Sequence, residues 1–240
     1  MSQAMASPAP SRNFSRNPVR AFYQSSIGKK ITVAVTGVIL IVFIVGHLLG
    51  NLEIYLGQDH TNWYAEFLRS TGPLLWIVRI ILLVAVIGHI VATVQLTVEN
   101  RRAKPKKYAV KAPQASTLAS RTMIYSGLLV LCFVIYHLLH FTFQTTNPEF
   151  RTLTDAQGRH DVYHMVILGF RQPLISSFYI LALFLLSMHL SHGFASVAQT
   201  LGINNRKVTG LISIGGQVFS WLIFMGYVSI PIMILLRILK

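Results

Sequence analysis

The sequence contains a single cysteine, Cys132, and therefore no second thiol with which it could pair. An internal disulfide and an iron–sulfur cluster held by this chain are both excluded, because each needs at least two cysteine sulfurs. No Cys-x-x-Cys-His segment occurs, which excludes a covalently attached c-type haem. Any redox chemistry of this chain must use other ligands.

Charged residues are also scarce, at 12% of the 240 residues, whereas 53% are hydrophobic. One soluble domain could not bury so many apolar side chains in a single core. The apolar residues gather in five runs, and each has the roughly 20 residues needed to cross the hydrocarbon of a bilayer. The runs are residues 31–52, 73–98, 121–143, 173–200 and 208–236. The predicted fold class is all-α, an integral membrane bundle of five transmembrane helices over residues 22–240.

Acidic residues are the rarest charged type, with 7 Asp and Glu against 21 Lys and Arg and a formal charge of +14. The basic residues fall in alternate connections: 14 lie before the first run and around the second and fourth connections, and six lie on the other side. This positive-inside asymmetry predicts a cytoplasmic N-terminus and an external C-terminus. The charge thus reports membrane topology, and we expect no nucleic-acid partner.

The N-terminal segment, residues 1–21, is rich in Ser, Pro, Asn and Arg, a composition typical of a disordered cytoplasmic tail. The first apolar run is too long for a signal peptide and no small-residue cleavage site follows a short apolar core. We therefore expect the first run to remain as a membrane span.

Four of the five runs carry a histidine inside the membrane, where an ionisable ring is costly and normally faces a partner. Counted from the expected helix starts, His47, His89, His137 and His189 each lie 16 residues along, roughly 24 Å from the face where the helix begins. Because the helices alternate in direction, His47 and His137 share a depth near the outer face. His89 and His189 share a depth near the inner face, and the two levels lie about 18 Å apart.

Two imidazoles at one depth on different helices are what a b-type haem needs, because the iron takes one nitrogen on each side of the ring plane. A single membrane histidine could instead bond to a neighbouring helix, but two depth-matched pairs favour two b haems. Small residues beside the histidines, such as Gly46 and Gly193, would leave room for the ring. Zinc is disfavoured because no carboxylate or thiolate accompanies the pairs.

Segments of four runs resemble one known family. They are FIVGHLLGNL, IGHIVATV, GLLVLCFVIYHLLH and LLSMHLSHGFASVAQTLGI, the last with the pattern H-x-S-x-G. They are similar to the di-haem cytochrome b membrane anchor of succinate dehydrogenases and fumarate reductases, in the five-helix, single-subunit form found in bacteria that use menaquinone. The resemblance covers about residues 22–240.

The resemblance implies a role in respiratory complex II at the bacterial cytoplasmic membrane. The proximal haem, next to the soluble subunits, would take His89 and His189, and the distal haem would take His47 and His137, as depth alone predicts. A flavoprotein subunit would oxidise succinate, or reduce fumarate, and an iron–sulfur subunit would pass electrons to this chain on the cytoplasmic side. The chain itself would hold no flavin or iron–sulfur cluster. Menaquinone would react near the outer face.

Two charged residues are candidates for work near the outer haem. A quinone there needs a group that exchanges protons with its oxygens, and Glu66 is the candidate because family members can carry an acid in this region; a solvated loop carboxylate is the alternative. Arg79 lies six residues inside the second run, roughly 9 Å from the outer face. A haem propionate is its expected partner, with snorkelling or a structural role as the alternative.

Further polar residues are candidates for haem propionates or quinone. His140 and His192 each follow a predicted ligand by three residues, one helical turn nearer the membrane surface, and either could replace its neighbour as ligand. Depth favours the first histidine of each pair, so we assign these two to hydrogen bonds with propionates, quinone or water. At the inner face the possible propionate partners are Ser26, Lys29, Lys30 and Arg121. His60, His160 and His164 fall in outer connections and are expected to be solvated.

Two other functions fit part of the pattern. A di-haem cytochrome b could serve another membrane dehydrogenase, such as a hydrogenase or formate dehydrogenase, but the fourth-run motif and the lack of histidine in the fifth run argue against it. A haem-free transporter could use the histidines as a proton relay. It predicts histidines spread along a path and helices broken in midspan, whereas only Pro231 interrupts a run here.

Overall fold

The computed structural model describes residues 17–103, 118–203 and 208–240, and its regular elements in these ranges are all helices. Five of them are long and apolar enough to cross a membrane. They are α2 (Ser26–Leu52), α4 (Pro73–Arg102), α5 (Leu118–His137), α7 (Pro173–Thr200) and α8 (Thr209–Leu235). The predicted all-α bundle of five transmembrane helices is confirmed.

The helix ends follow from local chemistry. Pro73 and Pro173 occupy the first turns of α4 and α7, where a missing N–H costs no helical bond. Helix α2 begins at Ser26 rather than at residue 31, because the Ser25 hydroxyl accepts the Gly28 N–H at 2.9 Å and caps the helix before the apolar run starts. A capping side chain therefore marks this boundary better than hydrophobicity does.

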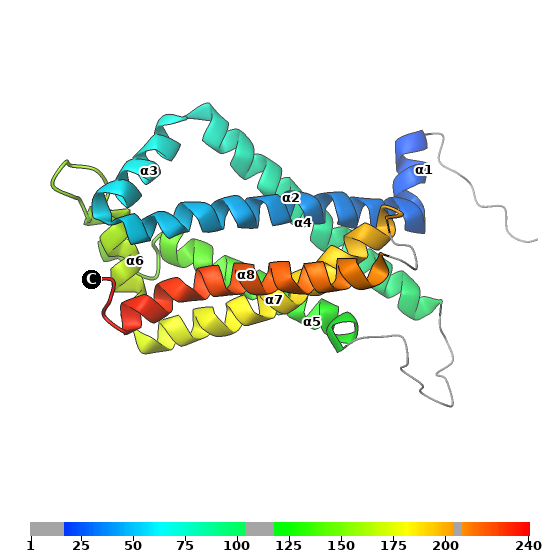
Figure 1. Ribbon diagram of the computed structural model, residues 1–240. Coiled ribbons are helices and arrows are strands. Elements are labelled where there is room, and N and C mark those ends of the chain that lie inside the picture. Colours follow the sequence, from blue (N-terminus) through cyan, green and yellow to red (C-terminus); the bar gives the residue numbers. More distant parts are fainter. Residues whose placement is uncertain (1–16, 104–117, 204–207) are drawn as a thin grey trace, which may run out of the picture.

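Helices α2 and α7 form the centre of the bundle. Helix α7 packs against α8, α5 and α2, and α2 also packs against α4 and α8. In Figure 1, α4 crosses α2 obliquely, whereas α7 and α8 run side by side. Two glycines of α8 allow close approach, because a Cβ at Gly226 would lie 2.9 Å from Leu48 Cδ2 and one at Gly216 would lie 3.1 Å from Phe194.

Short helices cover the end of the bundle where the C-terminus lies (Figure 1). They are the 3-10 turn η1 (Glu53–Leu56), α3 (Gln58–Ser70), the 3-10 turn η3 (Pro148–Thr152) and α6 (Val162–Phe170). Helix α6 is too short to cross a bilayer, yet Ile167 and Phe170 are buried in the main apolar core. We call this group of elements the outer cap.

The opposite end carries helix α1 (Pro18–Gln24), which is capped by Asn17 and has Pro18 in its first turn. The prediction of a disordered segment over residues 1–21 is therefore wrong for its last four residues, because cap and proline together favour a helical turn. Residues 1–16 lie outside the described part of the chain. With α1 and the C-terminus at opposite ends, the chain crosses the bundle an odd number of times.

Candidate functional site: two pairs of facing histidines

The inner pair consists of His89 on α4 and His189 on α7. The centroids of the two imidazole rings lie 6.5 Å apart and the ring planes meet at 63°. A metal–imidazole bond is about 2 Å long, so two rings on opposite sides of one metal ion have centroids roughly 6 Å apart. The predicted partners are therefore brought together at a separation that one metal ion could bridge.

Each ring of the inner pair meets a hydroxyl at its Nδ1. Thr36 Oγ1 lies 3.2 Å from His89 Nδ1, and Ser126 Oγ lies 3.2 Å from His189 Nδ1. Both hydroxyls donate to a carbonyl in the preceding turn of their own helix, so their oxygens are left to accept the Nδ1–H of the imidazole. With the hydroxyls donating in this way, each imidazole carries its proton on Nδ1 and its free lone pair on Nε2, which is the tautomer that a metal-ligating histidine requires.

A glycine follows each of these hydroxyl residues. A Cβ at Gly37 would lie 3.6 Å from His89 Cε1, and a Cβ at Gly127 would lie 3.3 Å from His189 Cε1. The two hydroxyl–glycine dipeptides thus support their rings in the same way. Neither dipeptide was predicted from the sequence, although both stand five residues into the first and third predicted runs, at a matching depth.

The outer pair consists of His47 on α2 and His137 at the end of α5, with ring centroids 5.9 Å apart and planes at 81°. The His47 ring stacks on Phe43 at 5.2 Å, and the ring of Tyr227 lies 6.2 Å away. The ring that faces His47 is that of His137 and not that of His140, as predicted. The structure thus brings together both predicted pairs.

His140 and His192, which follow the paired histidines His137 and His189 by three residues, have different surroundings. His140 is 1% exposed in the π-helical turn η2 (Leu138–Thr142), and its Nδ1 lies 3.0 Å from the hydroxyl of Tyr179. The same hydroxyl lies 3.4 Å from Nδ1 of His137. His192 is partly buried one turn beyond His189 on α7. His140 is therefore engaged by the protein core, whereas His192 keeps open the role assigned to it.

The outer candidates Glu66 and Arg79 are both exposed in the isolated chain. The guanidinium of Arg79 lies 5.0 Å above the ring of Trp76, a cation–π contact within one turn of α4. Glu66 lies on α3 and makes no hydrogen bond or ion pair with the residues that the structure describes. Neither side chain lies in an enclosed site formed by this part of the chain.

Among the inner candidates, Ser26 and Lys30 are exposed at the start of α2. Lys29 is 5% exposed, and its Nζ lies 2.5 Å from Oε1 of Glu99 on α4, so this ammonium group is already paired. Arg121 belongs to α5, but its side chain lies outside the described part of the structure. Ser26 and Lys30 therefore remain the accessible candidates.

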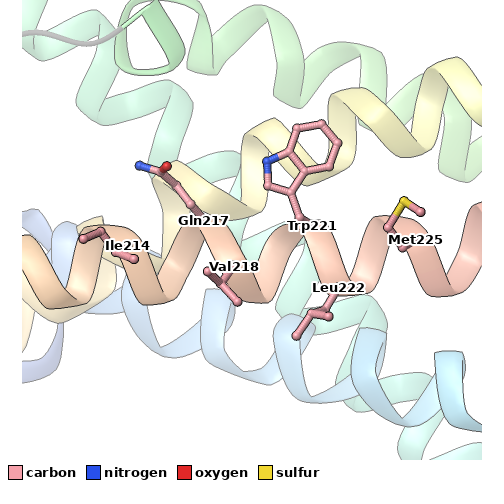
Figure 2. Close-up of a pocket in the computed structure, with 6 residues that line it drawn as sticks. All are labelled: Ile214, Gln217, Val218, Trp221, Leu222 and Met225. Atoms are coloured by element: carbon pink, nitrogen blue, oxygen red, sulfur yellow. The ribbon is translucent and has the colours of Figure 1, made fainter.

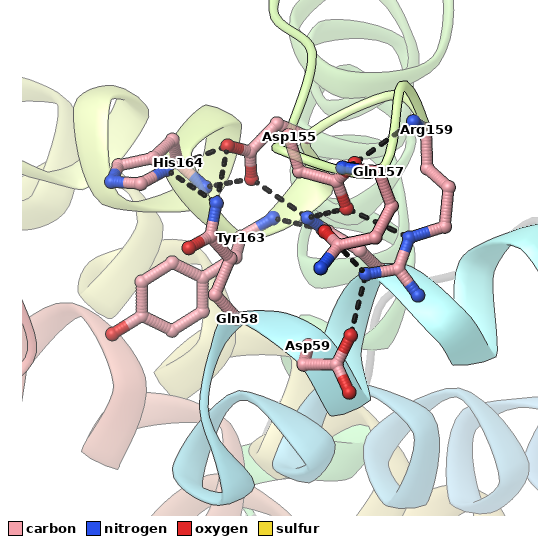
Figure 3. A network of polar contacts seen from close by, with 9 residues as sticks. Gln58, Asp59, Asp155, Gln157, Arg159, Tyr163 and His164 are labelled. Carbon is pink, nitrogen blue, oxygen red and sulfur yellow. Dashed lines mark hydrogen bonds and ion pairs between the residues drawn. The ribbon is translucent and has the colours of Figure 1, made fainter.

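A polar network ties the outer cap together (Figure 3). The Asn62 side chain of α3 is fully buried; its Nδ2 donates to Asp155 at 3.1 Å and to Asp161 at 3.0 Å, and its Oδ1 accepts the Tyr163 N–H. Arg159 bridges Asp155 and Asp59 at 2.8 and 2.6 Å. The network joins α3 to the loop that precedes α6.

The carboxyl groups of this network stay ionised in spite of their burial. Burial acts to raise the pKa of Asp161, but the N–H and ring of His164 and the amide of Asn62 outweigh it, and the pKa is lowered. Burial also acts to raise the pKa of Asp155, but hydrogen bonds, chiefly from Arg159, outweigh it and the pKa is lowered. Two charges of one sign can therefore share this small volume.

The expectation that the outer histidines are solvated is correct for His60 and His164 and wrong for His160. His60 is exposed, and the His164 side chain is 44% exposed although its Nδ1 lies 2.7 Å from Asp161. His160 is partly buried and lies 3.1 Å from the amide of Gln144. Burial, followed by the nearby charge of Arg69, lowers the pKa of His160. Sequence reasoning missed these contacts because it treated the third connection as a loop and not as a folded cap.

A shallow hollow of about 320 Å³ lies on the surface of α8 (Figure 2). Its lining comes from one face of that helix and is apolar except for one amide: Ile214, Gln217, Val218, Trp221, Leu222 and Met225. None of the paired histidines lines it. The hollow is therefore separate from the candidate site.

These features define a multi-pass membrane protein whose facing helices pair histidines at two places. Residues 97–224 match the family model described as succinate dehydrogenase/fumarate reductase transmembrane subunit. The match covers more than half of the chain, so the chain belongs to this family and is a membrane subunit of that oxidoreductase complex, with catalytic partner subunits. No curated protein and no solved structure was found that matches it.

The matched range includes α5, α7 and half of α8, and with them His137 and His189. His47 and His89 lie before it. The structure shows that these two residues outside the matched range, His47 and His89, face the two inside it, His137 and His189.

Proposed function

We propose that this chain is the electron-transferring anchor of a bacterial succinate:menaquinone oxidoreductase and that it holds two b haems. His89 and His189 would ligate the proximal haem, and His47 and His137 the distal haem. The observation that carries the proposal is the approach of both ring pairs, at centroid separations of 6.5 and 5.9 Å, from helices that are far apart in the sequence.

The residues around the pairs fit haem. At the inner pair, the hydroxyls of Thr36 and Ser126 leave Nε2 of each imidazole free to bind iron. A Cβ at Gly46 or Gly193 would meet no atom within 4 Å, so both glycines leave open space beside the histidines. When bound, haem supplies one-electron transfer, and the protein sets its orientation and electrostatic environment.

The two ends of the bundle suit different partners. Within residues 17–103, the end that carries α1 exposes the basic side chains Arg20, Lys30, Arg101 and Arg102, which suit the acidic surface of a soluble iron–sulfur subunit. At the other end, Glu66 would exchange protons with menaquinone and Arg79 would bind a distal propionate. Charge moved between the ends would work with or against the membrane potential, at about 2.3 kcal/mol per charge per 100 mV.

Membership of the succinate dehydrogenase/fumarate reductase family favours this function over an anchor for a hydrogenase or formate dehydrogenase. The transporter alternative is weakened as well, because α8 continues as one helix through Pro231 and no described span is broken at midspan. The π-helical turn η2 comes only at the end of the third span. Succinate oxidation and fumarate reduction both use the same path, in opposite directions.

The proposal is tested by a reduced-minus-oxidised visible spectrum and haem quantitation of the purified complex. We expect two b haems per chain in the native complex. His89→Ala and His47→Ala should each remove a different one, and His60→Ala, an exposed histidine of the outer cap, should remove neither. A native complex without haem would overturn the proposal, and haems that survive both substitutions would show that the ligands are wrong.

A further inference from the structure

The Tyr179 hydroxyl of α7 lies between two imidazoles of the third span. It is 3.4 Å from Nδ1 of His137 and 3.0 Å from Nδ1 of His140. Tyr179 is 3% exposed and His140 is 1% exposed, so no bulk water competes for these contacts. A phenol has one hydrogen to donate, and its oxygen can accept another.

The direction of these two hydrogen bonds follows from the ligand role proposed for His137. A neutral imidazole that binds iron through Nε2 carries its proton on Nδ1. His137 must then donate to the oxygen of Tyr179, and the hydroxyl of Tyr179 must donate to Nδ1 of His140. Both hydrogen bonds therefore point the same way, from His137 to Tyr179 and from Tyr179 to His140.

The local backbone and packing hold His140 at the end of these two hydrogen bonds. Its π-helical turn η2 follows directly after His137, and such turns are frequent at functional sites. Rings of Phe141 and Phe150 lie 4.1 and 5.7 Å from the His140 ring, and a Cβ at Gly169 would lie 3.2 Å from its Cε1. The imidazole is enclosed on several sides, and it is not free to reach a propionate or a quinone.

We propose that Tyr179 and His140 are positioning residues for the distal haem: they fix the tautomer and the basicity of its ligand His137. The inference rests on the proposed function and deepens it. An acceptor on Nδ1–H makes an imidazole a more basic ligand, which favours ferric iron because that state carries the additional positive charge. The inner pair uses the aliphatic hydroxyls of Thr36 and Ser126 instead.

The experiment is a spectroelectrochemical titration of both haems in the assembled complex. Tyr179→Phe keeps the ring and removes the hydroxyl, so we expect one midpoint potential to rise and the other to stay unchanged. A ten-fold change in the relative stability of the two oxidation states, the lower end of what such outer partners contribute, corresponds to about 59 mV. Tyr136→Phe is the matched control, because the Tyr136 ring lies 6.0 Å from Tyr179 but its hydroxyl bonds to neither histidine.

Two variants test His140 separately and do not depend on the tyrosine variant. His140→Phe removes the acceptor of the Tyr179 hydroxyl and should move the same potential in the same direction. His140→Asn offers an amide oxygen near the position of Nδ1 and should restore it at least in part. The unchanged proximal haem reports that the bundle is intact in each variant.

Three results would overturn the inference. If Tyr179→Phe and His140→Phe leave both midpoint potentials unchanged, Tyr179 and His140 do not act on His137. If His140→Phe and His140→Asn shift the distal potential equally, an acceptor for the Tyr179 hydroxyl is not what sets that potential. If the native complex holds no haem, the proposed function fails with the inference, whereas two haems without a selective shift would reject only the positioning role.

Discussion

At the inner pair, one hydroxyl and one glycine decide how each imidazole points. The hydroxyl accepts from Nδ1, and the glycine next to it lets the ring lie against the helix. The two dipeptides, Thr36–Gly37 and Ser126–Gly127, come from different helices and act on histidines of two others. This arrangement makes the inner site dependent on four helices at once.

Removing one of these hydroxyls should affect one site selectively. Ser126→Ala leaves Nδ1–H of His189 without an acceptor, and we expect an affinity loss of about ten-fold for the proximal haem, because outer partners of a metal ligand contribute 10- to 100-fold. The measurement is haem transfer from the complex to an excess of apomyoglobin. Ser187→Ala is the control, since Ser187 is also buried but bonds only to a carbonyl of its own helix. Equal haem loss from both variants would contradict the role of Ser126.

The pairing of the four histidines could be predicted from the sequence, because depth in a membrane follows from counting residues along helices of known direction. The side chains that form hydrogen bonds with those histidines could not be predicted in this way. Which side chain meets His137 depends on the rotation of α5 against α7 and on the π-helical turn after it, and hydrophobicity encodes neither. The hydroxyl–glycine dipeptides did carry a signal, their equal depth, but only once the histidine levels were known.

The elements that the sequence analysis missed are the short ones. Helices α3 and α6 have 13 and 9 residues, and neither has the length by which a span is recognised. They are fixed by side chains from distant parts of the chain: Asn62 of α3 holds two aspartates that precede α6. Such contacts are set by tertiary structure and leave no periodic pattern.

The outer cap should loosen when this amide is lost. Asn62→Ala leaves Asp155 and Asp161 without a shared donor and leaves the Tyr163 N–H without its acceptor. A buried polar group without its partner costs about 1–3 kcal/mol, so we expect amide hydrogen exchange in Gln58–Ser70 to become roughly ten-fold faster or more. Asn147→Ala is the control, because its amide bonds only to the exposed Glu149. Unchanged exchange in both variants would show that the cap does not depend on Asn62.

On the scale of the whole molecule, the two ends of the bundle differ in chemistry. One end carries α1 and the basic side chains, and its Lys29–Glu99 pair joins α2 to α4. The other end is closed by the outer cap, and the Tyr163 hydroxyl there donates to the carbonyl of Lys240 at 3.0 Å. Between them the spans expose many large apolar side chains, as surfaces in contact with lipid do. The five spans and this asymmetry give the two ends of the bundle different surfaces.

The orientation gives a test of the whole arrangement. The positive-inside rule predicts that the end with the basic residues faces the cytoplasm, so the outer cap and the distal haem would face outward. In a Cys132→Ser background, single cysteines at exposed sites can be labelled on intact cells with a membrane-impermeant maleimide. Ser70→Cys and Arg237→Cys should react at once, whereas Ala103→Cys and Leu201→Cys should react only after permeabilisation. The reverse pattern would put the partner subunits of the cytoplasm next to His47 and His137, and it would exchange the proximal and distal roles of the two pairs.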